Sequence, residues 1–272
     1  MRTVRLGQGL FAIASASLAI WSLAYGDFAW GGQSLLAGIP WRETWVYGVA
    51  LILLAASVGL CLPRTALPSV LTIAVYQVAG LAIFVPQILS NPLGIGGWYP
   101  FCEALTPLAG AWVLYAMLSR ETRRSGTPIV GEVAMRVAQV LFGLTCIFYG
   151  WSHFLYPDYT ASMVPTLLPG RLAFAYFTGL AHMAAGLAII VGILPRLAAT
   201  LEAIMMSLFG LLVWVPSFFT HPRPQWAASP ESQWSELVVN LVLAASAWII
   251  AIYFEKHPWA FVPRSRVQVS QS

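Results

Sequence analysis

The chain runs from Thr65 to Cys102 without one charged side chain. Similar apolar stretches recur along it between short polar breaks, and only 9% of its residues are charged while 59% are hydrophobic. A typical globular chain carries about 25% charged residues, so this composition cannot build a water-soluble surface. Intrinsic disorder is also excluded, because it requires few apolar residues. The sequence therefore predicts an integral membrane protein, and it excludes cytosolic enzymes and nucleic-acid-binding proteins.

The lengths of the apolar stretches predict how many helices cross the membrane. A helix needs about 20 residues to span a hydrocarbon core of about 30 Å. The longest stretch must break in the middle, and Pro86, Asn91-Pro92 and Gly94-Ile95-Gly96-Gly97 predict a loop there, with the next helix starting near Pro100. The length rule predicts eight spans, at about residues 5–27, 43–64, 65–86, 100–118, 133–152, 171–191, 196–216 and 234–254.

The first span and the basic residues predict the topology. Arg2 and Arg5 before an apolar run resemble a secretory signal, but the run is long for one and has no persuasive Ala-x-Ala cleavage site, so we interpret it as a retained span. Of the 14 Lys and Arg residues, the eight-span arrangement puts only three on one side and the other eleven on the opposite side. Cytoplasmic loops carry the excess of Lys and Arg, so both termini are predicted to be cytoplasmic.

Landmarks in the first half of the chain recur in the same order in the second half. Leu62-Pro63-Arg64 recurs as Leu194-Pro195-Arg196, and Tyr25-Gly26 recurs as Tyr149-Gly150. Four spans per copy is an even number, so both copies enter the membrane from the same face, as parallel repeats. We predict an all-α protein of two four-helix bundles, at residues 1–118 and 133–256, with a cytoplasmic linker at 119–132 and a cytoplasmic tail at 257–272.

The second half resembles a known family. The segments that carry the resemblance are Tyr149-Gly-Trp-Ser-His-Phe154, Leu168-Pro-Gly-Arg171 and Gly179-Leu-Ala-His-Met-Ala-Ala-Gly186. Over about residues 130–255 they resemble the DoxX-like family of four-helix membrane proteins, and the whole chain looks like a fused tandem form. The resemblance implies a bacterial inner-membrane protein. One branch, DoxD, resembles the membrane subunit of a thiosulfate:quinone oxidoreductase, which implies a redox-linked quinone-binding subunit with a membrane or periplasmic redox partner.

Four polar residues of the predicted spans are candidates for a ligand pocket. An ionisable side chain at the centre of a span costs about 2.5–3.5 kcal/mol on insertion scales, so each one needs a structural or functional reason. Matching positions in the first half hold Asp27, Leu53, Glu103 and Pro107, so the histidines and the amide are not needed for folding alone. We predict that the pocket lies in the outer half of the second repeat and is lined by His153, His182, Glu236 and Asn240.

Each of these side chains also has a purely structural interpretation. His182 could be a neutral imidazole bonded to a neighbouring helix, and His153 could belong to an interfacial aromatic belt. Glu236 is favoured at a helix N-terminus by the helix dipole. Glu202 is predicted to pair with Arg196 or to meet interfacial water, outside the pocket.

Other residues predict packing instead of chemistry. Cys61, Cys102 and Cys146 are predicted to be apolar packing residues. We predict no metal site, because His and Glu lack HxxxH or ExxH spacing. The small residues from Gly179 to Gly186 predict a face for close helix packing.

Three functions remain open at this stage. The first is a redox-linked subunit that binds quinone or another lipophilic molecule; no motif predicts autonomous catalysis or an intrinsic cofactor. The second is a scaffold for other membrane proteins, which would use the outer tryptophans Trp30, Trp41, Trp98, Trp226 and Trp234. The third, a small-molecule carrier, is disfavoured because it predicts polar residues in both halves.

Overall fold

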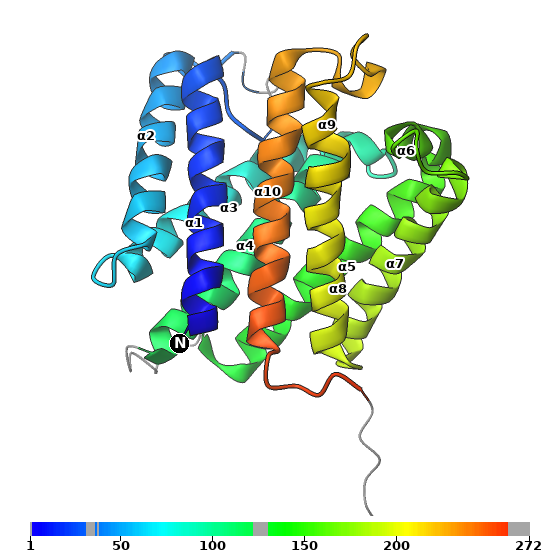
Figure 1. Cartoon of the computed structure of the whole chain (residues 1–272). Coiled ribbons are helices and arrows are strands. Elements are labelled where there is room, and N and C mark those ends of the chain that lie inside the picture. Colours follow the sequence, from blue (N-terminus) through cyan, green and yellow to red (C-terminus); the bar gives the residue numbers. More distant parts are fainter. Residues whose placement is uncertain (1, 31–35, 37, 122–129, 261–272) are drawn as a thin grey trace, which may run out of the picture.

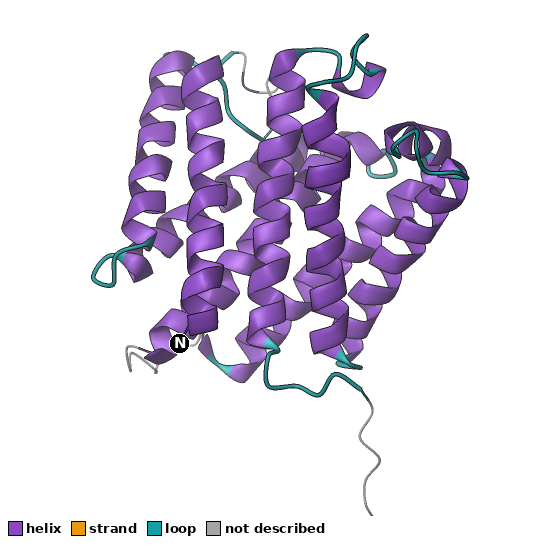
Figure 2. Cartoon of the chain, viewed as in Figure 1, coloured by secondary structure: helices purple, strands orange, loops and turns teal. Residues whose placement is uncertain are grey.

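The computed structural model describes residues 2–30, 36, 38–121 and 130–260, and the regular structure in these ranges is entirely helical (Figure 2). Within them, eight helical runs are long and apolar enough to cross a membrane, which confirms the predicted number of spans. Seven are single helices: α1 (Arg2–Tyr25), α2 (Arg42–Leu60), α3 (Ala66–Ser90), α4 (Ile95–Glu121), α5 (Glu132–Leu155), α7 (Arg171–Val191) and α10 (Pro230–Tyr253). The eighth joins α8 (Pro195–Phe209), the π-helix η3 (Gly210–Trp214) and α9 (Val215–Ser217). Two short elements, α6 (Pro157–Met163) and η4 (Gln225–Ala227), lie between spans.

The break between α3 and α4 is shorter than predicted. Helix α3 continues past Pro86 to Ser90, and α4 already begins at Ile95, so only residues 91–94 interrupt the two spans. Gly94 lies in this break as predicted, but Gly96 and Gly97 belong to α4, and Gly97 lets the two helices approach: a Cβ there would lie 3.0 Å from Ile88 Cγ1. Prolines inside membrane helices are tolerated because neighbouring groups satisfy the freed backbone. Most of the predicted linker, residues 122–129, lies outside the described residues.

The spans share one continuous core. Helix α1 packs on α2 and α10, α3 on α4, α4 on α5 and α10, α5 on α7, and α8 on α10 (Figure 1). Fully buried side chains from both halves meet in this core, among them Phe11, Leu53, Phe142, Ile189 and Ile249. The N-terminus and the end of α10 lie at the same end of the molecule.

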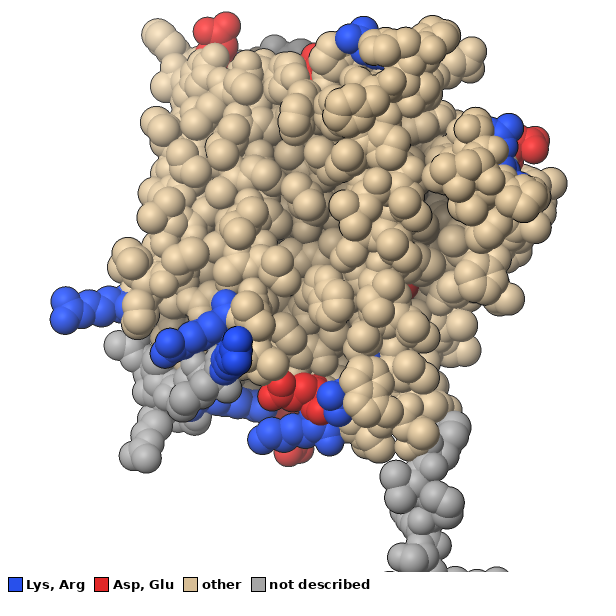
Figure 3. Space-filling model, viewed as in Figure 1, with Lys and Arg blue, Asp and Glu red and all other residues tan. Residues whose placement is uncertain are grey.

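The surface of the molecule has the polarity expected of a bilayer-spanning protein. In Figure 3 almost all charged side chains lie toward the two ends, and the broad band between them is nearly free of charge. This band includes large apolar side chains that are more than half exposed, such as Val75, Leu180 and Leu187. Water would disfavour so much exposed apolar surface. The eight apolar helices therefore indicate a multi-pass membrane protein.

Four glycines allow α5 and α7 to pack closely. Gly143 and Gly150 of α5 face Gly186 and Gly179 of α7, and a Cβ at any of them would collide with the opposite helix. Small residues at such crossings let helix backbones approach in a membrane. The close-packing face predicted between Gly179 and Gly186 is therefore present, and it fixes how the histidines on these two helices lie relative to each other.

Candidate functional site

A cavity of about 710 Å³ lies among α5, α7, α8 and α10, and part of α4 also lines it. Its walls are mostly apolar, and α7 and α8 form its two opposite sides. The wall residues Phe177, Leu201 and Leu208 lie well inside the spans and are more than 40% exposed. The cavity therefore opens sideways between α7 and α8, where Figure 3 shows the surface hollowed, and this opening faces the apolar band.

All four residues predicted for a pocket line this cavity. His153 comes from the last turn of α5, His182 from the middle of α7, and Glu236 and Asn240 from successive turns of α10. The four residues thus line the same cavity, and their role as ligand contacts remains a prediction.

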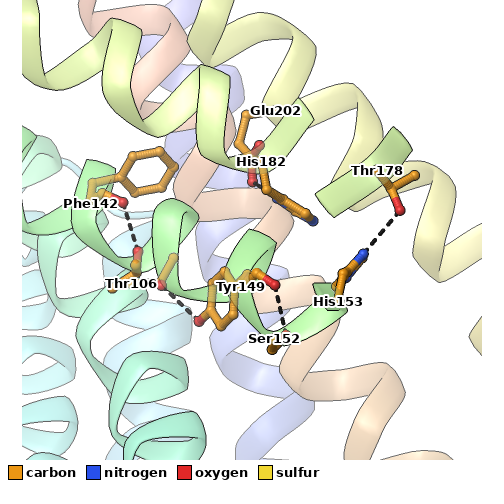
Figure 4. Close-up of polar contacts among 9 residues, drawn as sticks. Thr106, Phe142, Tyr149, Ser152, His153, Thr178, His182 and Glu202 are labelled. Atoms are coloured by element: carbon orange, nitrogen blue, oxygen red, sulfur yellow. Dashed lines mark hydrogen bonds and ion pairs between the residues drawn. The ribbon is translucent and has the colours of Figure 1, made fainter. Parts of the chain in front are cut away.

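His182 forms a buried pair with Glu202 of α8. Its Nδ1 lies 2.8 Å from Glu202 Oε1, and both residues are 1% exposed (Figure 4). The second carboxylate oxygen, Oε2, is also buried and has no hydrogen-bond partner among the described residues. The other nitrogen of His182, Nε2, points away from Glu202, toward the side where His153 lies. A carboxylate that orients an imidazole in this way is a recurrent arrangement in proton-transfer sites.

The predicted place of Glu202 was therefore wrong. Arg196 instead lies over the ring of Trp259, 4.0 Å from its centroid, and reaches the carbonyl of His257. Residues six apart in a helix lie on different faces, so spacing alone argued against a pair between Arg196 and Glu202. Glu202 is seven residues from Pro195, which puts it about 10 Å along the helix, below the interface.

His153 is tied to α7. Its Nδ1 lies 3.1 Å from the carbonyl oxygen of Ala175 and 3.1 Å from Thr178 Oγ1. Because a carbonyl can only accept, Nδ1 carries the hydrogen and Nε2 of the neutral ring is left as an acceptor. The rings of His153 and His182 are 5.4 Å apart, centroid to centroid. His153 is thus part of the cavity wall and not of an outward-facing aromatic belt.

Aromatic rings continue this wall toward the end of the cavity formed by α4 and α10. Phe209 and Tyr149 lie with ring centroids 5.6 Å and 6.2 Å from that of His182, and Tyr99 lies 5.8 Å from Tyr149. Tyr149 is held from behind by a 3.0 Å hydrogen bond between its hydroxyl and that of Thr106.

Two carboxyl groups line this end of the cavity. Glu103 of α4 and Glu236 of α10 both line it, are half-buried, and lie within electrostatic range of each other and of Tyr99. Tyr159 of α6 is nearby: burial raises the pKa of its hydroxyl, and the Glu236 carboxylate raises it further. Glu103 was not among the residues predicted for the pocket and was named only as the counterpart of Glu236 in the first half. Its match to Glu236 in the predicted duplication was the only signal in the sequence that pointed to Glu103.

Asn240 of α10 packs against the irregular part of the run formed by α8, η3 and α9. It is 6% exposed, and its Oδ1 has no hydrogen-bond partner in the described part of the chain. This oxygen lies against Gly210, where α8 gives way to the π-helix η3. Single π-turns inside α-helices are frequent at functional sites.

Of the matching positions of the first half, Glu103 lines the cavity and the other three lie elsewhere. Asp27 pairs with Arg42, Leu53 is buried in the core, and Pro107 lines a small void of about 20 Å³. In the described ranges no group of three His, Cys, Asp or Glu side chains is placed to hold a metal ion. Cys61 is exposed, Cys102 and Cys146 are buried, and all three are free.

The tryptophans proposed as a scaffold surface are only partly exposed. Trp41 and Trp234 are exposed. Trp30 stacks on Tyr76 at 4.1 Å, Trp226 packs on Trp214, and Trp98 donates to the carbonyl of Pro92.

In a comparison with protein families, residues 142–251 match a family described as a domain of unknown function (DUF8561). The matched segment contains α7, α8 and most of α10, together with the second half of α5, and all four of these helices line the cavity. Comparison with curated proteins and with solved structures finds no match.

Proposed function

We propose that this protein takes up a lipophilic ring compound from the bilayer into the cavity between α7 and α8, and that a quinone is the first candidate. The observation that carries the proposal is an apolar cavity of about 710 Å³ with the His182–Glu202 pair in its wall. Small-molecule sites are typically clefts of about 300–1,000 Å³ with apolar walls and a few convergent polar groups.

The two imidazoles suit a headgroup that exchanges protons. The Glu202 carboxylate can hold the proton at Nδ1 of His182, which leaves Nε2 of the same ring to exchange a proton with a ligand. His153 presents Nε2 as an acceptor, as its bond to Ala175 requires. Nε2 of His182, when it carries a proton, could thus donate to a carbonyl of a quinone-type ring, and Nε2 of His153 could accept from a hydroxyl of the same ring. Electrons would come from a redox partner at the membrane or on its periplasmic side, and the protein would act as a subunit.

We further propose a bacterial inner-membrane location with both termini in the cytoplasm. The eleven-to-three bias of Lys and Arg supports this orientation, and the DoxX-like resemblance supports the location. Helix α1 packs on α2 and α3 on α4, as α5 packs on α7 and α8 on α10, which supports two parallel repeats at residues 1–118 and 133–256.

Titration of the purified protein in lipid nanodiscs with a short-chain ubiquinone analogue tests the proposed function. We expect His182→Gln and Glu202→Gln to weaken binding about tenfold to a hundredfold, because a charge-assisted hydrogen bond is worth about 1.5–3 kcal/mol. Gln77→Leu is the matched control: Gln77 is equally buried in α3 but does not line the cavity. Affinity unchanged in both pocket variants would overturn the proposal.

A scaffold remains the second candidate, and the exposed rings of Trp41 and Trp234 favour it. It predicts that a fixed membrane partner co-purifies with the His182→Gln variant but not with a Trp41→Ala/Trp234→Ala variant.

A further inference from the structure

Apart from its two histidines, the ionisable Asp, Glu, Lys and Arg residues of the cavity lining are all acidic. Its lining contains three carboxyl groups, from Glu103, Glu202 and Glu236, and no Lys or Arg among the described residues. Glu202 has His182 as its partner, while Glu103 of α4 and Glu236 of α10 line the same cavity within electrostatic range of each other. Two nearby carboxylates disfavour each other's ionised form, and a cation placed between them relieves that repulsion.

The chain itself supplies no cation to this pair in the described ranges. Figure 3 shows the visible Lys and Arg side chains at the ends of the molecule. Among the three basic residues predicted on the same side as Glu236, Arg42 is paired with Asp27, while Arg171 and Arg223 are exposed in or beside loops.

Two further features of this end of the cavity suit a cationic group. Tyr99 lies within electrostatic range of both carboxyl groups, and aromatic faces attract ammonium groups within about 6 Å. Asn240 lies one turn deeper than Glu236, lines the cavity and is only 6% exposed; its Oδ1, beside Gly210, has no hydrogen-bond partner in the described chain. A buried acceptor without a donor is costly, and an N–H group of a ligand would satisfy it.

From this geometry we propose that Glu103, Glu236, Tyr99 and Asn240 form a subsite for a cationic group, so that the cavity accepts lipophilic amines and related organic cations. The apolar wall between α7 and α8 would hold the lipophilic part, and the carboxyl pair would hold the charge. The inference rests on the proposed function only in requiring that the cavity admit a lipophilic molecule.

Two ions of nearly equal shape and opposite charge test the subsite. Tetraphenylphosphonium and tetraphenylborate are titrated separately into nanodiscs of neutral lipid, with binding to empty nanodiscs subtracted. We expect the cation to bind about tenfold or more tightly than the anion, because charges near a protein surface attract by several kcal/mol. Glu103→Gln/Glu236→Gln should abolish this preference, and Glu236→Asp, which keeps the charge, should retain it. Glu43→Gln is the control, because Glu43 is an exposed carboxylate at the start of α2.

Equal binding of the two ions, no binding of either, or a preference that survives the double substitution would overturn the subsite. The quinone analogue separates this inference from the proposed function. If the analogue does not bind but the phosphonium preference is present and needs both carboxyl groups, the quinone proposal fails and the subsite stands. If the analogue binds and needs His182 while the two ions bind equally, only the subsite fails.

Discussion

The pair of His182 and Glu202 shows how two residues that a membrane helix normally excludes can be accommodated. Each alone would leave an ionisable group buried among apolar side chains, at a cost of several kcal/mol. Together they share a 2.8 Å hydrogen bond at 1% exposure. The cost is not fully removed, since Oε2 of Glu202 has no partner in the described ranges. We infer that this pair is retained for its chemistry, since apolar packing would stabilise the helices at least as well.

This interpretation predicts a characteristic pattern of stabilities. His182→Leu and Glu202→Leu should each destabilise the protein by about 3–5 kcal/mol, because each leaves a buried partner uncompensated. The double variant His182→Leu/Glu202→Leu should recover most of that loss, since no buried polar group remains. Thermal unfolding in one detergent measures all three. A double variant less stable than either single variant would contradict the interpretation.

At the scale of elements, the close crossing of α5 and α7 sets the geometry of the cavity wall. Gly150 and Gly179 bring the two backbones together, and the Cβ of His153 lies just 2.8 Å from where a Cβ of Gly179 would be. The same two helices carry His153 and His182, so the 5.4 Å separation of the imidazole rings depends on this crossing. The site is therefore sensitive to helix packing as well as to its own side chains.

We expect Gly150→Ala to destabilise the protein by about 1–3 kcal/mol through overpacking, because the added methyl group would clash with the carbonyl of Gly179. It should also weaken binding of the quinone analogue by moving the two histidines apart. Gly48→Ala is the matched control. Gly48 lies in α2 with no atom near its Cβ position, so alanine there should be neutral or stabilising. Equal unfolding temperatures for the two variants would contradict the proposed role of the crossing.

At the scale of the whole molecule, the two halves share a core but differ in what they enclose. The first half buries Leu53 and joins Asp27 to Arg42, whereas the second half encloses the cavity. The first half contributes to the cavity through α4, which supplies Tyr99 and Glu103. One half thus acts mainly as support, and the ligand site depends on both.

The orientation of the molecule in the membrane can be tested with a native residue. Cys61 is exposed at the end of α2, next to Arg64 on the side predicted to be cytoplasmic, while Cys102 and Cys146 are buried. A membrane-impermeant maleimide should label Cys61 in inside-out vesicles and not in intact spheroplasts. Cys61→Ala gives the background labelling. Ser229→Cys, made in the Cys61→Ala variant and placed before α10, should show the opposite pattern. Labelling of Cys61 from the outside would reverse the proposed topology.

The parts of the structure that the sequence predicted depend on local properties. Charge-free runs of about 20 residues determined the number of spans, because hydrocarbon thickness sets helix length. The clustering of His153, His182, Glu236 and Asn240 in one cavity followed from comparing the two halves. The sequence could not predict that Glu202 pairs with His182. The two residues lie on different helices, and the rotation of α7 relative to α8 is set by packing. The helix ends near Pro86 and Pro100 were misplaced for a related reason: tertiary contacts at Gly97 outweigh local helix-breaking tendencies.

The sideways opening between α7 and α8 has a consequence for how occupancy is set. A compound that enters from the acyl chains is already concentrated there by partitioning, at about 0.8 kcal/mol for each methylene group of its tail. The relevant concentration is then its mole fraction among lipids, and modest contacts with the protein suffice for high occupancy. Half-saturation expressed per volume of buffer should rise with the amount of lipid added, whereas half-saturation per mole of lipid should stay constant.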